Sequence, residues 1–402
     1  MCVPGYGKTA RELARNCQTL FNNMDVKLVL TKMASMGMGT IDTNLDLEAY
    51  LETLLESNTT KVIFLTNAVV DFGRPDGDPL PPRASTREQQ ELILKLKALP
   101  KVVETIRKTR KDIFLVACKQ TFGLSDDEMY IAGLELCKRA SCNLVLVNDK
   151  VRRQNMIVTP EEARYHVTTN RHDVLWNLAE MAYLRSHMTF TRSTVVDGKP
   201  IPWNSDLVPD ALRRVVDYCI ERGAYKPFRG STAGHFACKL NETTFLTSIR
   251  KTDFNDLDKN GLVKVVTDGP DSVMAYGAKP SVGGQSQRIV FHEHQEYDCI
   301  VHFHCPIKEG SLVPVASQRA YECGSHACGQ NTSSNLKRFG NLSAVYLDQH
   351  GPNIVFHKSI DPMEVIAFIE ANFDLEQKTG GFVSLNQIRQ TPSTLETAKE
   401  IL

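Results

Sequence analysis

IVHFHC, residues 300–305, is the stretch around which the second half of the chain is organised. Side chains alternate along a strand with a period of two, so His302 and His304 are expected on the same face. His350 follows a second apolar run, residues 344–347, and is itself followed by a glycine. Three imidazoles from two neighbouring strand ends are typical of a catalytic zinc site with a vacant fourth position. The alternative is two half-buried strand histidines that hydrogen-bond to the backbone.

The composition is that of a two-domain globular protein. With 402 residues, the chain is long enough for two full cores. Lysine plus arginine and aspartate plus glutamate each number 47, so no net charge favours nucleic acid or an anionic membrane. The hydrophobic share is 42%, and no apolar run approaches ~18 residues, so we expect no membrane span. The N-terminus does not read as a signal peptide, and eleven cysteines without paired spacing are typical of reduced thiols, which predicts a cytoplasmic location.

In the first half, helices alternate with short apolar strands. Helical spacing of apolar residues predicts helices over 9–21, 45–55, 101–108 and 126–140. Apolar runs predict strands over 26–30, 61–70, 113–117 and 143–147. This alternation predicts an α/β domain with a parallel sheet, whose ligands bind at the carboxyl ends of the strands. The polar side chains at those ends are Asn67, Asp71, Lys119, Asn148 and Asp149. Taken singly, each is also a common turn or cap residue.

In the second half, strands dominate and helices lie at the ends. Residues 189–205 are polar and contain Gly198, Pro200 and Pro202, which predicts an interdomain linker. After it we expect helices over 209–222, 288–297 and 362–373, and strands over 237–240, 244–247 and 262–266 besides the two histidine strands. The pattern predicts an α+β domain with a central antiparallel sheet. We therefore expect domains over 1–188 and 206–375, and a tail over 376–402 that contacts another subunit.

Five motifs in the second half resemble the class II aldolase/adducin family, and L-fuculose-1-phosphate aldolase in type. They are residues 230–237 (GSTAGHFA), 245–248 (FLTS), 277–281 (GAKPS), 297–304 (YDCIVHFH) and 347–356 (LDQHGPNIVF). The resemblance covers roughly residues 206–375. It implies a divalent metal, zinc, on His302, His304 and His350. It also implies a small, phosphorylated hydroxy-carbonyl substrate that reacts through a metal-stabilised enediolate.

The same resemblance implies a phosphate site and an acid–base residue. Small residues and hydroxyls would contact the phosphate, and a basic side chain would pair with it. The residues expected there are Ser231, Thr232, Gly234, His235, Ser248, Arg250 and Ser281. An ordinary hairpin with exposed basic residues is the alternative. The family's catalytic Glu is missing from residues 281–287, where Gln285 cannot take a proton, so Glu293 and Glu296 are the nearest substitutes unless both face solvent.

Motifs in the first half resemble the phosphopantothenate–cysteine ligase family. They are residues 67–72 (NAVVDF), 95–107, 116–121 (VACKQT), 146–149 (LVND) and 155–159 (NMIVT). That family binds CTP and activates a carboxylate as an acyl-cytidylate, which implies a nucleotide at the five strand-end residues given above. The resemblance covers roughly residues 5–188 and lacks the family's opening strand, Gly-rich turn and Ile-Ser-Asn motif, so we expect a truncated ligase domain.

Three functions are compatible with these patterns. The first is a metal-dependent lyase of the aldolase type acting on a small molecule. The second is a non-catalytic scaffold or binding module of the adducin type, which the missing Glu favours and the three histidines oppose. The third is a CTP-dependent carboxylate–amine ligase completed by another chain. Both families form symmetric oligomers, so a homo-oligomer, dimer or tetramer, is expected.

Overall fold

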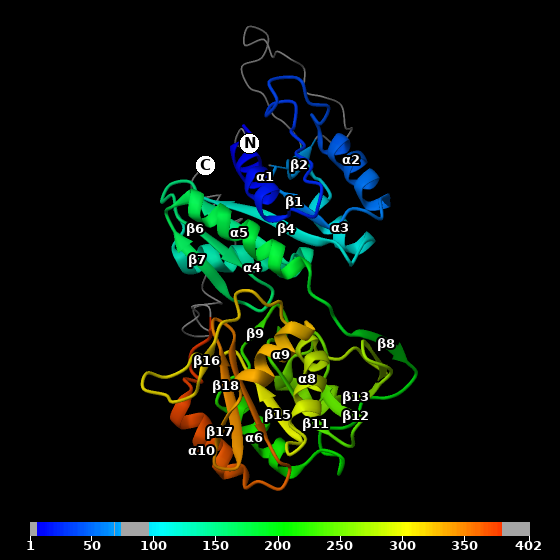
Figure 1. The fold of residues 1–402 in the computed structure, drawn as a ribbon, viewed down its shortest axis with the longest axis vertical. Coiled ribbons are helices and arrows are strands. Elements are labelled where there is room, and N and C mark those ends of the chain that lie inside the picture. Colours follow the sequence, from blue (N-terminus) through cyan, green and yellow to red (C-terminus); the bar gives the residue numbers. More distant parts are fainter. Residues whose placement is uncertain (1–5, 68, 74–95, 380–402) are drawn as a thin grey trace.

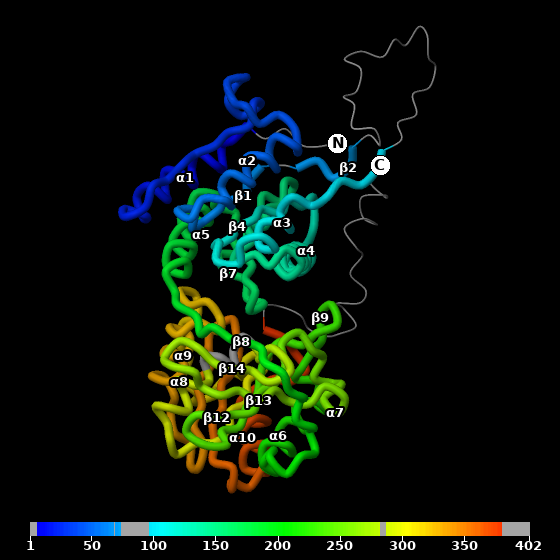
Figure 2. Tube along the Cα trace, turned by 90° about the vertical axis from the view of Figure 1, so that its right-hand side faces the viewer, coloured from blue at the N-terminus to red at the C-terminus, as the bar shows by residue number. Residues whose placement is uncertain are grey.

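The computed structural model describes residues 6–67, 69–73 and 96–379, without the side chains of 282–286. The chain forms two bodies that lie one above the other along the long axis (Figures 1 and 2). The first body contains the predicted α/β sheet, and the second contains the larger antiparallel sheet. The expected fold class is therefore confirmed.

The first body is built on a five-stranded mixed sheet. Its strands are, in spatial order, β1 (Val62–Leu65), β4 (Phe114–Thr121), β5 (Leu144–Asp149), β6 (Asn155–Val158) and β7 (Arg164–Thr168). The pairs β1–β4 and β4–β5 are parallel, whereas β5–β6 and β6–β7 are antiparallel. Short turns join the last three strands, and a parallel connection would require a long crossover. A small ladder joins β2 (Phe72–Gly73) to β3 (Lys97–Ala98).

Helices cover both faces of this sheet. They are α1 (Lys8–Leu20), α2 (Asn44–Glu56), α3 (Val102–Thr109), α4 (Asp126–Ala140) and α5 (Arg171–Ser186). Alternate residues of β4 enter different cores: Leu115 packs with α2, α3 and α4, and Val116 packs with α1 and α5. The strand predicted over 26–30 does not form, because these residues pair with no described strand and Leu28 and Val29 stay exposed.

The second body is built on a ten-stranded sheet. Its strands are, in spatial order, β16 (Val315–Ala316), β18 (Leu342–Leu347), β19 (Gly351–Phe356), β15 (Cys299–His302), β11 (His235–Lys239), β12 (Thr244–Ser248), β13 (Leu262–Thr267), β14 (Ser272–Tyr276) and β8 (Arg192–Val196), with β17 (Lys337–Phe339) paired to β18. All internal pairs are antiparallel, and only the edge pairs β16–β18 and β14–β8 are parallel. A separate ladder joins β9 (Pro227–Phe228) to β10 (Ser231–Thr232).

Helices pack on opposite faces of this sheet as well. They are α6 (Asp210–Glu221), the 3-10 turn η1 (Phe254–Asp256), α7 (Leu257–Asn260), α8 (Val282–Glu293), α9 (His326–Asn335) and α10 (Pro362–Asn372). Val301 of β15 packs with α6 and α10, and its neighbour Ile300 packs with α8. Helix α8 begins and ends earlier than predicted over 288–297. Helix α9 occupies part of the region between the histidine strands and begins where the Ser325 side chain accepts from the Cys328 N–H.

Residues 189–205, expected as a linker, are part of the second body. They contain β8, which pairs in parallel with β14 and satisfies the backbone groups of that edge strand. Ile201 bridges to Leu262, and the buried Trp203 ring lies edge-on to Phe236. The polar, proline-containing composition of residues 189–205 predicted a linker. The segment is instead attached to the second body, because β8 pairs with the edge strand β14 and the Trp203 indole is buried there.

Side chains of the first body reach into the second. Arg185, at the end of α5, donates through Nε to the Arg319 carbonyl over 3.1 Å, and Asn143 donates to Glu322 over 2.8 Å. No helix in the described part of the chain is long and apolar enough to cross a membrane. The described cysteines form no disulfide with one another.

Candidate metal centre

The three predicted histidines come together where β15 meets the β18–β19 turn. His302 is the last residue of β15, His304 follows two residues later, and His350 lies between β18 and β19. The turn approaches the 302–304 backbone so closely that a Cβ on Gly351 (φ 145°) would lie 2.1 Å from the Phe303 carbonyl oxygen. Only glycine fits this position, so the residue after His350 determines how near its imidazole comes to the other two.

The separations between the rings suit a small cation. The Nε2 atoms of His302 and His350 are 3.3 Å apart, and one ligand atom from each of the three rings lies within 4.8 Å of the others. Nitrogen ligands of a tetrahedral zinc, each at ~2.05 Å from it, lie about 3.3 Å apart. All three side chains are buried. The three imidazoles can therefore hold a divalent cation if the two ligand atoms that lie farthest apart move closer together.

Hydrogen bonds orient the first ring. His302 Nδ1 donates to the Pro352 carbonyl over 2.7 Å, which leaves a lone pair on Nε2. Either His350 donates to that lone pair, or a cation binds both nitrogens. Among the described residues, His350 Nδ1 is buried without a hydrogen-bond partner, so the imidazole pair by itself leaves a polar atom unsatisfied.

Burial keeps the imidazoles neutral. It lowers the pKa of His302 and His304 well below the usual value, and the neighbouring His350 adds to both effects. Burial, followed by the adjacent His235, lowers the pKa of His350 to about 3. Neutral imidazole is the form that binds metal, so no proton needs to leave at neutral pH.

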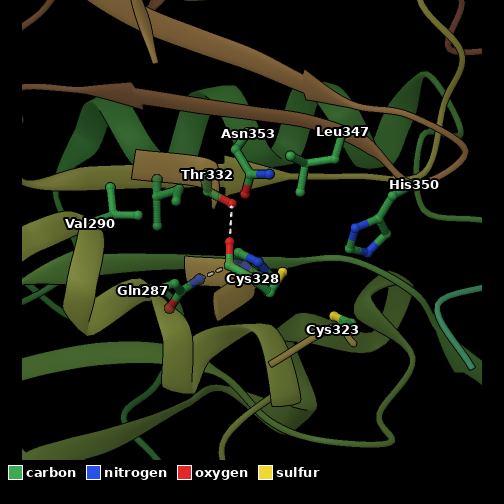
Figure 3. Close-up of a pocket in the computed structure, with 10 residues that line it drawn as sticks. Gln287, Val290, Cys323, Cys328, Thr332, Leu347, His350 and Asn353 are labelled. Atoms are coloured by element: carbon green, nitrogen blue, oxygen red, sulfur yellow. Dashed lines mark hydrogen bonds between the residues drawn. The ribbon is translucent and has the colours of Figure 1, made fainter. Parts of the chain in front are cut away.

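A cavity of about 10 Å³ adjoins the cluster, with His350, Cys323 and Gln287 around it (Figure 3). That volume holds roughly one water molecule. The Gln287 amide accepts from Thr247 through Oε1 and donates through Nε2 to His235 Nδ1. Neutral His235 therefore carries its proton on Nε2. Its ring lies 4.7 Å from that of His302, so it serves as a hydrogen-bond donor beside the candidate ligands.

The residues expected to bind phosphate come from three segments that lie together. The Thr232 N–H donates to the Thr252 carbonyl, the Ser281 N–H to the Ser248 carbonyl, and the Arg250 N–H to the Lys279 carbonyl. Ser248 Oγ is buried and has no hydrogen-bond partner among the described residues. It is therefore free to contact a ligand.

Two further features belong to this region. Gly234 lies so close to β15 that a Cβ there would be 2.6 Å from the His302 carbonyl oxygen, and its φ of 110° favours glycine. Partial desolvation of its guanidinium lowers the pKa of the exposed Arg250, and so does the charge of Arg107 from the first body. Ser231 is half-buried on β10. The region thus contains hydroxyls and guanidinium groups but lies beside the histidines rather than among them.

The expected acid–base residues lie elsewhere. Glu293, at the end of α8, is exposed and accepts hydrogen bonds from Gln330 and Ser333 of α9. The Glu296 side chain is 62% exposed. The Gln285 side chain lies outside the described residues. The carboxylate beside the buried histidines is Glu162 of the first body, with Oε2 3.8 Å from His304 Nδ1. Local sequence patterns carry no signal for it, because it belongs to the other half of the chain.

The strand-end residues of the first body have separate roles. Asp149 accepts from the Thr121 hydroxyl and from three backbone N–H groups, so its carboxylate holds the surrounding turns. Asp71 pairs with Lys101 at the surface. Burial, and then Arg139, lowers the pKa of Lys119. The remaining two candidates are Asn148 on β5 and the half-buried Asn67 after β1. Nucleotide binding by this group stays a prediction.

No family model matches the chain. It is 26% identical over 148 residues to the coenzyme A biosynthesis bifunctional protein CoaBC of Thermococcus kodakarensis, a match that covers 35% of each protein. The chain thus spans about a third of the length of this curated relative.

Solved structures of two kinds are similar to parts of the chain. The DNA/pantothenate metabolism flavoprotein of Streptococcus pneumoniae is 14% identical, covering 44% of this chain and 88% of that one, with a TM-score of 0.34. YgbL of Escherichia coli and an L-fuculose 1-phosphate aldolase are 20% and 16% identical, each covering 40% of this chain and 82% of theirs, with TM-scores of 0.31. The proteins found are thus of the two kinds that the sequence motifs resemble.

Proposed function

We propose that this chain binds one divalent cation, zinc by preference, on His302, His304 and His350. We further propose that it acts as a lyase of the class II aldolase type on a small hydroxy-carbonyl compound. The observation that carries the proposal is the convergence of three buried, neutral imidazoles beside a cavity lined by both polar and apolar side chains. Such a set leaves a position for a further ligand, which a closed structural site would not.

A bound cation would supply a Lewis acid that polarises the substrate's carbonyl group. The chain's own residues would bind and orient the rest. His235 would donate its Nε2 proton to a substrate oxygen, since Gln287 occupies Nδ1. Ser248 and Arg250 would hold an anionic end of the substrate, because the Ser248 hydroxyl has no hydrogen-bond partner among the described residues and the exposed Arg250 side chain carries a positive charge. A cavity of about 10 Å³ holds roughly one water molecule, so such a substrate needs more room beside the histidines than this cavity offers.

Metal analysis of the purified protein tests the binding step. We expect close to one zinc per chain in the wild type and a large loss in His302→Ala. His357→Ala is the matched control, because its imidazole lies in the same body, is half exposed and pairs with Asp298 over 3.1 Å. A metal-free wild type, or equal metal contents in the two variants, would reject the site.

Cleavage of phosphorylated hydroxy-ketones, followed by a coupled assay for the released aldehyde, tests the lyase step. We expect turnover that chelation abolishes and zinc restores. Equal turnover with and without metal would reject the mechanism.

The second candidate is a non-catalytic, metal-bound module, which the small cavity favours. It predicts stoichiometric zinc without cleavage of any of these substrates.

CTP binding by the first body is tested separately by calorimetric titration, where a constant heat of dilution would exclude it.

A further inference from the structure

The turn between β6 and β7, residues 159–163, carries a buried carboxylate from the first body to the histidine cluster. The Thr159 N–H donates to the Ala163 carbonyl over 3.1 Å, and Glu162 adopts a left-handed conformation with φ 68°. The hydroxyl of Tyr130, from α4, donates to the Glu162 carbonyl oxygen. The Glu162 side chain is 3% exposed. Its position therefore depends on the core of the first body and on the contact between the two bodies.

Three groups face the Glu162 carboxylate. Oε1 lies 3.1 Å from Lys138 Nζ of α4, and Oε2 lies 2.5 Å from Lys378 Nζ. Oε2 is also 3.8 Å from His304 Nδ1. Two lysine ammonium groups and the Nδ1 side of the His304 ring thus face this carboxylate.

We propose that Glu162 completes the metal centre from the other half of the chain: with the cation bound, its carboxylate closes the 3.8 Å separation, accepts the Nδ1 proton of His304 and holds Nε2 toward the cation. This inference rests on the proposed metal site. Metal-binding histidines commonly donate their second N–H to a carboxylate or a carbonyl, which sets the tautomer and strengthens the ligand. His302 already uses the Pro352 carbonyl in this way. For the His304 ring, Glu162 supplies the one carboxylate that lies within 4.0 Å among the described residues.

The consequence is a coupling between the two bodies. Glu162 is a positioning residue, so metal affinity depends on the first body being docked. By reciprocity, a bound cation strengthens that docking. The first body would then act as a control element for the metal centre, whether or not it binds a nucleotide.

The test is a zinc competition titration of the full-length protein against a chromophoric chelator. Glu162→Gln should weaken zinc affinity about 10- to 100-fold and alter the visible spectrum of the Co²⁺-loaded protein. Glu162→Asp, which keeps the carboxylate, should restore part of the affinity. Glu322→Gln, a control at the same interface whose carboxyl contacts Asn143, should keep the wild-type affinity and spectrum.

Lys378→Met separates positioning from a structural role. It removes a cation that competes for Oε2, so zinc should bind at least as tightly as in the wild type. If Lys378→Met weakens zinc as much as Glu162→Gln does, or if Glu162→Gln binds zinc within twofold of the wild type with an unchanged Co²⁺ spectrum, the inference is overturned. A wild type that binds no zinc overturns both this inference and the proposed function. Weakened zinc binding together with an absence of lyase turnover supports Glu162 and rejects only the lyase.

Discussion

Replacing Arg185 by methionine should lower the free energy of unfolding by about 3–5 kcal/mol. The guanidinium lies 2.7 Å from a Glu161 carboxylate oxygen, and both side chains are 0% exposed. It also donates to the carbonyls of Arg319 and Gln318 in the second body, over 3.1 and 3.4 Å. Arg185 thus compensates a buried charge and joins the two bodies.

The magnitude follows from what the substitution leaves behind. Methionine fills most of the volume of the arginine stem, so little cavity forms. The main cost is the buried Glu161 carboxylate without its cation, which accounts for the several kcal/mol. In Glu161→Met/Arg185→Met neither member of the pair carries a charge, and the two carbonyls lose a donor, so we expect a cost of about 1–2 kcal/mol. The double variant should therefore be more stable than Arg185→Met alone.

Urea unfolding, followed by tryptophan fluorescence, measures both effects. The chain has one tryptophan in each body, Trp176 on α5 and Trp203 beside β11, so removing either one leaves a reporter for the other body. We expect the two reporters to unfold together in the wild type and at different urea concentrations in Arg185→Met. A loss below about 1 kcal/mol in Arg185→Met, or a double variant as unstable as the single one, would refute the reasoning.

Three further outcomes are expected. Gly351→Ala should abolish zinc binding and lower the melting temperature, because its Cβ would meet the Phe303 carbonyl. Gly310→Ala, where a Cβ meets nothing within 4 Å, should cost only about 1 kcal/mol, and equal losses in calorimetry would contradict this. Burial raises the pKa of Glu322 from 4.5 to about 7. The folded state then holds the proton more tightly, so stability should fall by about 3 kcal/mol as pH rises from 4.5 to 7, and Glu322→Gln should flatten this slope in urea titrations at several pH values. Chelation should lower the melting temperature of the wild type and leave that of His302→Ala unchanged, whereas equal shifts would place the metal elsewhere.

Local residue patterns were sufficient for most of the fold. Apolar runs such as 113–117 and 143–147 became the central strands β4 and β5, because a strand covered on both faces requires an apolar side chain at every position. The strand predicted over residues 26–30 was wrong. This run is also apolar, but no neighbouring strand in the described part of the chain completes its backbone hydrogen bonds. The pattern also could not show that β6 and β7 turn back antiparallel, since that depends on which sheet edge is free.

Histidine spacing and the following glycine were enough to propose which imidazoles converge, because strand period and turn geometry act over a few residues. The carboxylate beside them could not be found in this way. Glu293 and Glu296 are near in sequence but stay at the surface, whereas Glu162 reaches His304 from the other half of the chain. Contacts of that kind arise when two separately formed cores pack together. Their geometry follows from the shapes of both bodies, and the spacing of residues within either one does not encode it.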